Sequence, residues 1–129
     1  MSFGTATVLT SAGRAITTNR IKGAGTEPNY VSIGVGATGA ARTAVAADTA
    51  LSSAVENRIL GTSTQVTTTS TNDTYQVVGT VTATAARAVD EAGLFDASTA
   101  GNMYLSATFP VVSLSTGDSI QTTLKVQYS

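Results

Sequence analysis

Few side chains in this chain could do chemistry, because it contains no histidine and no cysteine. Nucleophile–base pairs that use those residues are excluded, and so are zinc sites built from nitrogen and sulfur ligands. Carboxylates remain, and Asp90, Glu91 and Asp96 lie close together in the sequence. Such a group could act as the acid pair of a glycosidase or as oxygen ligands for Ca²⁺.

The surrounding sequence supports neither chemistry. The alternating acids of a Ca²⁺ loop are absent, and aromatic residues, which line many sugar clefts, make up only 5% of the chain. Asp90, Asp96 and Asp118 fit turns, where Asp side chains accept hydrogen bonds from nearby backbone. Glu91 precedes an apolar run, and Arg87, four residues earlier, would share its face of a strand. We therefore predict no enzymatic activity and no catalytic, cofactor-binding or metal-binding residues.

The stretch from Glu91 to Phe109 is organised as a β-hairpin. Two apolar runs, AGLF and MYLSATF, flank the turn-rich segment Asp96–Asn102. In the second run Met103, Leu105, Ala107 and Phe109 alternate with polar residues and Tyr104. This period of two predicts a half-buried strand, and Pro110 is expected to end it or to mark a sheet edge.

Further strand-like runs are separated by turn residues at short intervals. They are Thr5–Thr10, Arg14–Ile21, Tyr30–Gly36, Arg58–Thr71, Thr74–Thr84, Val111–Leu114 and Ser119–Tyr128. Arg58–Thr71 and Thr74–Thr84 are expected to pair as a hairpin, and period-two alternation along Thr74–Thr84 and Ser119–Tyr128 predicts one inward face on each. The alanine-rich segment Ala37–Asn57 is irregular, and we expect a loop with a short helical turn near Asp48–Val55, capped by Asp48. The pattern predicts an all-β fold, an antiparallel β-sandwich or jelly roll with an extended N-terminal segment and little helix.

Two regions are expected along the chain. Residues 1–23 would form an N-terminal arm or hairpin, and residues 24–129 would form the β-sandwich domain. No apolar run is long enough for a membrane span, and the first residues lack the features of a signal peptide. We therefore expect synthesis in a cytoplasm and no membrane partner.

The composition favours contact with other protein subunits. Charged residues make up 12% of the chain and the net charge is −1, so little electrostatic repulsion keeps copies apart. A solvated, threonine-rich surface is the alternative explanation. Basic residues are scattered apart from Arg14–Lys22, and we expect no nucleic-acid partner. Carbohydrate binding would need an exposed aromatic platform, and Tyr75 and Tyr128 are expected to face inward.

Several short motifs resemble those of small structural proteins from the virions of tailed bacteriophages. They lie between about residue 24 and the end of the chain: Gly25–Pro28, Tyr30–Gly36, Asp48–Leu51, Thr71–Tyr75, Glu91–Asp96 and Gly117–Ile120. Members of this group carry the labels head-decoration, tail-collar and tail-fibre protein.

The resemblance implies a non-enzymatic virion component without cofactors. The short chain lacks the heptads of a fibre shaft, which favours a capsid decoration (cement) protein that bridges and stabilises major capsid subunits. Its partner would be the major capsid protein or another virion protein, and a homotrimer or homodimer would fit. A tail, baseplate or fibre-associated subunit is the alternative, followed by a carbohydrate-binding adhesin.

Overall fold

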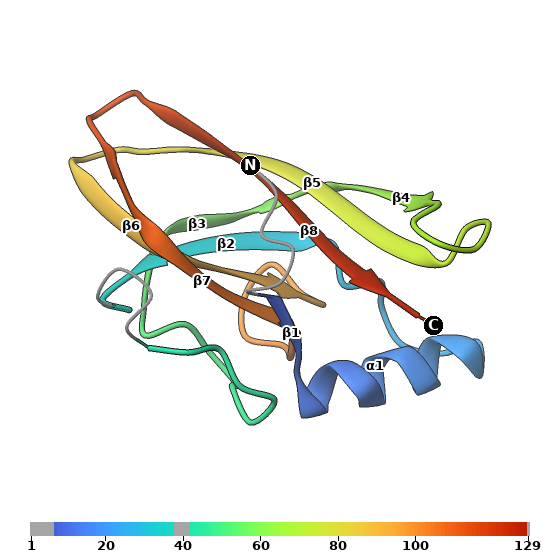
Figure 1. The fold of residues 1–129 in the computed structure, drawn as a ribbon. Helices are drawn as coiled ribbons and strands as arrows, with labels where there is room; N and C mark the ends of the chain where they lie inside the picture. The colour runs from blue at the N-terminus through green and yellow to red at the C-terminus, as the bar shows by residue number, and fades with distance from the viewer. Residues whose placement is uncertain (1–6, 38–41, 129) are drawn as a thin grey trace.

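The computed structural model describes residues 7–37 and 42–128, which form one α-helix and eight β-strands. In chain order these are β1 (Thr7–Leu9), α1 (Ser11–Ile21), β2 (Tyr30–Val35), β3 (Ser53–Leu60), β4 (Thr62–Val66), β5 (Thr74–Thr82), β6 (Arg87–Phe95), β7 (Met103–Leu114) and β8 (Ser119–Gln127). One sheet has the order β1-β7-β6-β2-β3 and the other β4-β5-β8, and all pairs are antiparallel. The three-stranded sheet lies across the five-stranded one (Figure 1). The predicted all-β sandwich is confirmed.

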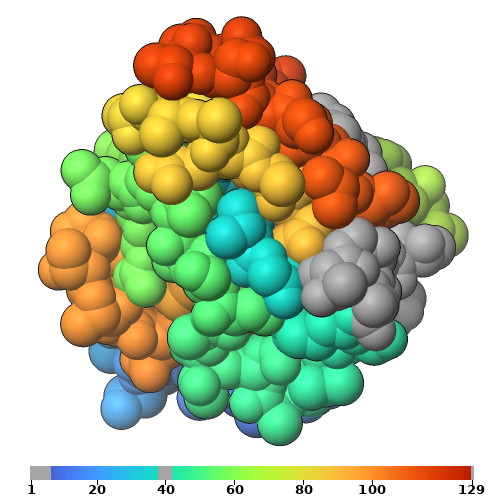
Figure 2. All heavy atoms as spheres, turned by 90° about the vertical axis from the view of Figure 1, so that its left-hand side faces the viewer, coloured from blue at the N-terminus to red at the C-terminus, as the bar shows by residue number. Residues whose placement is uncertain are grey.

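The hairpin of β6 and β7 lies at the centre of the five-stranded sheet, as the sequence predicts, with its turn at residues 96–102. The predicted half-buried character is wrong, because every residue from Met103 to Phe109 is buried. One face of the hairpin packs on the three-stranded sheet. The loop of residues 42–52 covers part of the other face and also packs beside β3 (Figure 2).

The core between the sheets is mainly aliphatic, with Tyr104 and Phe109 as its buried aromatic residues. Its fully or almost fully buried members include Val31 and Ile33 of β2, Val77 and Val81 of β5, Ala92 and Leu94 of β6, Leu105 and Ala107 of β7, and Ile120 and Leu124 of β8. The alternation predicted for β5 and β8 is therefore confirmed. Burial of this apolar area is the main favourable contribution to folding.

The expected strand Arg58–Thr71 is divided between the two sheets. Ser53–Leu60 pairs with β2, and after Gly61 the chain enters β4, which pairs with β5 as the predicted hairpin. A Cβ at Gly61 would lie 2.5 Å from Cγ1 of Val77, so the crossing requires a residue without a side chain.

The expected strand Arg14–Ile21 is helical instead. Thr10 accepts a hydrogen bond from the Gly13 N–H (2.9 Å) and caps the helix, while Ile16 is buried in the core. Gly13 allows the helix to approach the backbone of Tyr104 on β7. Packing of the helix against the backbone of β7 therefore overrides the local preference of its threonines and isoleucines for strands. The role of residues 1–23 as an arm stays a prediction.

Two further expectations change. The helical turn near Asp48–Val55 is absent: Asp48 is engaged in an ion pair, and the last three of those residues begin β3. Pro110 does not end β7. Glu91 pairs with Thr108 and Val89 with Val112, so Pro110 falls within a β-bulge where its missing N–H costs no ladder bond.

We predict that Gly13→Ala destabilises the protein by about 1–3 kcal/mol, because the new methyl group would overlap the Tyr104 carbonyl and displace α1 from β7. Helix propensity alone predicts the opposite sign, a gain of about 1 kcal/mol. Urea denaturation measures the difference. Arg14→Ala, at the exposed neighbouring position, is the control and should stay close to wild type. A more stable Gly13→Ala protein would contradict the close packing.

Candidate functional site

The three acids singled out from the sequence do not form one cluster. Asp90 and Glu91 are buried within β6, where an Asp90 oxygen accepts a hydrogen bond from the Ala37 N–H (3.1 Å). Asp96 lies in the β6–β7 turn and accepts from the Asn102 N–H (2.7 Å). Across residues 7–37 and 42–128 there is no group of three or more acids, histidines or cysteines placed to bind a metal ion.

Glu91 is fully buried and belongs to a charge cluster on the outer face of the five-stranded sheet. Its two oxygens accept from Arg42 (2.9 Å) and from the Ser53 N–H (3.1 Å). Arg42 also contacts Asp48 (3.0 Å), which accepts from the Ser106 hydroxyl (2.7 Å). The cluster connects the loop of residues 42–52 to β6 and β7.

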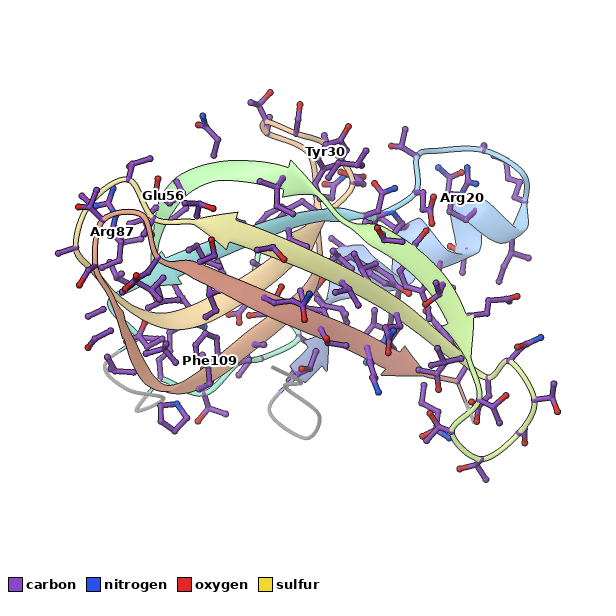
Figure 3. All side chains as sticks on the ribbon, turned by 90° about the horizontal axis from the view of Figure 1, so that it is seen from above. Arg20, Tyr30, Glu56, Arg87 and Phe109 are labelled. Atoms are coloured by element: carbon purple, nitrogen blue, oxygen red, sulfur yellow. The ribbon has the colours of Figure 1, made fainter. Side chains whose placement is uncertain are left out.

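Glu91 and Arg87, expected to share one face of a strand, do not pair with each other. The Arg87 guanidinium contacts Glu56 on β3 (2.9 Å), and Figure 3 shows these two side chains at the same corner of the sandwich. A bulge in β3 places Glu56 at a φ of 62°, where it also accepts from the N–H and hydroxyl of Thr84. The bulge at Val89–Glu91 also breaks the simple alternation on which the prediction depended.

The electrostatics of the Arg42–Asp48 pair favour the charged form of both side chains. Burial opposes the charge on Asp48, but hydrogen bonds from Ser106, the Val45 N–H and Arg42 outweigh it and lower the Asp48 pKa. Burial likewise opposes the charge of Arg42, yet its bonds to Asp48 and Glu91 raise the Arg42 pKa. Arg42 and Asp48 therefore stabilise each other's charge, and neither is a proton donor or acceptor poised near neutral pH.

Three of the four tyrosines come together between α1 and the three-stranded sheet. The rings of Tyr75 and Tyr104 meet edge to face, with centroids 5.9 Å apart. The Tyr104 and Tyr128 hydroxyls are in hydrogen-bond contact, and Thr17 reaches Tyr128 (2.9 Å). Tyr30 lies in a different cluster, with Leu51, Phe95 and Met103.

Tyr75, Tyr104 and Tyr128 line a pocket of about 370 Å³. Ile16, Ile21 and Pro28 provide apolar walls, and Arg20, Glu27 and Gln65 provide polar groups. Tyr75 donates to the Pro28 carbonyl (3.0 Å) and to Glu27 (3.2 Å). A larger pocket of about 550 Å³ lies on another side of α1, near Asp96 and Asn102.

Two sequence expectations about the tyrosines need correction. Tyr128, expected to face inward, is 44% exposed because it follows the end of β8. Tyr104 was placed on the face opposite Leu105, but both belong to the core between the sheets. Leu94 pairs with Leu105 and Phe95 with Met103, so Tyr104 lies in a bulge that turns its ring toward Tyr75.

Burial is the main reason that the pKa values of Tyr75 and Tyr104 are raised, so both remain neutral hydroxyls.

The β4–β5 turn is fixed by one acid. Asp73 accepts hydrogen bonds from the N–H groups of Thr68, Thr69 and Ser70 (2.9, 3.0 and 2.9 Å) and from the Gln127 side chain (2.8 Å). The bond from the Ser70 N–H, followed by those from the other N–H groups, lowers the Asp73 pKa. The turn thus sets the position of β4 at the edge of its sheet.

The chain matches no protein-family model, no curated protein and no solved structure. None of the described residues forms a helix long and apolar enough to cross a membrane.

We predict that Asp73 makes folding stability acid-sensitive. Its folded pKa lies below the unfolded value of about 3.9, so its contribution is present above about pH 4 and is lost as pH falls toward the folded pKa. Urea melts at a series of pH values should show that Asp73→Asn lowers stability at pH 7 and flattens its decline in acid. Asp118→Asn is the control. Asp118 also lies in a turn, but one backbone N–H, that of Ser115, is seen to donate to it, whereas three donate to Asp73. An unchanged acid slope in Asp73→Asn would contradict this role.

Proposed function

We propose that this chain is a non-enzymatic structural subunit of a tailed-bacteriophage virion, a capsid decoration protein that bridges and stabilises major capsid subunits. The observation that carries the proposal is the uncharged edge strand β4, which pairs with β5 alone among the described strands. Monomeric proteins usually protect such edges with charges, proline or a covering segment, and an unprotected edge is a surface for another chain.

The ionisable side chains support a structural role. Glu91, Arg42 and Asp48 connect a loop to the central hairpin, and the Glu56–Arg87 pair joins β3 to β6. Arg58 stacks on Phe95, 3.5 Å from the ring centroid, and donates to two carbonyls of the β6–β7 turn. The surface around β4 is rich in exposed threonines, and their hydroxyls suit close contact with other subunits.

The short motifs between residue 24 and the end of the chain supply the virion context, through their resemblance to bacteriophage structural proteins. A decoration protein adds contact area across the joints of a shell. Each copy can bind weakly, because the stabilisation of the shell is the sum over many copies. The partner would be the major capsid protein or another virion protein, with this chain as a homotrimer or homodimer. A tail, baseplate or fibre-associated subunit is the alternative within the same class.

We predict that an antibody against this protein, carried on gold particles, labels the heads of intact virions in electron micrographs. Particles lacking the protein should lose their genome at a lower temperature than complete particles, because the shell joints lose contact area. Particles that lack the protein and are then supplied with it in purified form provide the control. Label confined to the tail would favour the alternative subunit, and absence of label from purified particles would overturn the virion proposal.

Carbohydrate binding is the second candidate, favoured by the convergence of Tyr75, Tyr104 and Tyr128 on one pocket. Aromatic rings with polar tips can contact both the apolar face and the hydroxyls of a ligand. If this candidate is correct, a glycan array gives a signal that Tyr128→Ala removes and that Tyr30→Ala, outside the pocket, retains. An array without signal contradicts it.

A further inference from the structure

β4 is an edge strand with an open side. Among the described residues it pairs only with β5, with Thr62 opposite Val78 and Val66 opposite Thr74. Backbone N–H and C=O groups on the other side of an edge strand point away from the sheet, where another strand can bind them. Figure 3 shows β4 along the margin of the three-stranded sheet, with β8 at the opposite margin.

The sequence around β4 lacks the usual protection of an edge. Residues 59–72 contain no charged residue and no proline. The opposite edge strand, β8, carries Lys125, whose exposed charge is of the kind that blocks strand addition. The contrast between the two edges of one sheet indicates that β4, rather than β8, is adapted to accept a strand.

One well-exposed apolar side chain adjoins this edge, and others line the pocket that β4 helps to form. Among the described residues, the large apolar side chains that are well exposed are Ile21 (81%), Leu60 (64%), Val45, Val111 and Tyr128. Leu60 is two residues before β4, and Ile21 and Tyr128 line the pocket that also includes Gln65 of β4. Apolar exposure at Leu60, beside an open edge, is consistent with an interaction surface.

We propose that a second copy of this chain binds here, with its β4 antiparallel to the first and the twofold axis through Thr64. This arrangement joins the two three-stranded sheets into one sheet of six strands. It places Thr62 opposite Val66 and Ser63 opposite Gln65, so no charge meets a like charge across the axis. An axis through a residue also keeps the same face of both sheets toward their cores.

A second copy is the occupant that the edge chemistry favours. An isologous contact requires a surface that complements itself, and a strand without charge meets this condition where a charged strand would repel its copy. The proposal rests on the homo-oligomer part of the proposed function and is independent of the virion location. Purified protein tests the former and labelled particles test the latter, so the two can fail separately.

Charge substitution at Thr64 tests the interface, because this exposed residue would meet its own copy across the axis. Sedimentation equilibrium of the wild-type protein should give a concentration-dependent dimer. Thr64→Lys alone and Thr64→Glu alone should each dimerise about fivefold more weakly, as expected for like charges directly opposite. An equimolar mixture of the two variants should restore dimers. Thr80→Lys, exposed on the central strand β5, is the control and should dimerise like wild type.

A cysteine in this cysteine-free chain gives an independent readout. In the proposed register the Cα atoms of the two copies of residue 64 lie about 4.5–5.5 Å apart, within the range of about 4.4–6.8 Å that a disulfide spans. Oxidation of Thr64→Cys should therefore yield a covalent dimer, whereas Thr80→Cys should remain monomeric on a non-reducing gel. A wild-type protein that stays monomeric up to its solubility limit would overturn the proposal. So would an oligomer that is insensitive to all Thr64 variants.

Discussion

The buried Glu91 carboxylate is the constraint on which the rest of the five-stranded sheet depends. A charge with no exposed surface at the centre of a sheet is stable only if cationic and N–H groups surround it, and Arg42 and Ser53 provide them. Removing one partner of such a buried pair typically costs about 3–5 kcal/mol. Gly34, directly across from Glu91 on β2, leaves the space: a Cβ there would lie 2.5 Å from the Glu91 oxygen. The pair thereby fixes the loop of residues 42–52 over the outer face of the hairpin.

Tyr104 on β7 connects α1 to the three-stranded sheet. A bulge turns its ring toward Tyr75, and its backbone carbonyl accepts the Thr10 N–H that precedes α1. Gly13 lets the helix lie directly on this backbone. The tyrosine-lined pocket is formed where residues of α1 face the three-stranded sheet, and Gln65 of β4 is part of its lining.

Much of the sandwich could be predicted from alternation and turn residues. The β6–β7 and β4–β5 hairpins, β2 and the buried face of β8 follow from period-two patterns and from Asx-rich turns such as Asn72–Asp73. The candidate site could not be predicted in this way. Arg42 and Glu91 are 49 residues apart, and Tyr75 and Tyr128 are further separated still, so no spacing in the sequence signals that they meet.

The sequence by itself determined the fold class, because alternating β-branched residues and closely spaced turns act over a few neighbouring positions. It also limited the chemistry, since a chain without histidine or cysteine lacks the commonest nucleophile–base pairs and the nitrogen and sulfur ligands of zinc. Tertiary structure decided that residues 11–21 form a helix, that Gly61 divides one long strand between two sheets, and that β7 is buried on both faces from Met103 to Phe109. These outcomes depend on which distant backbone lies within contact distance, and that is settled only when the sheets pack.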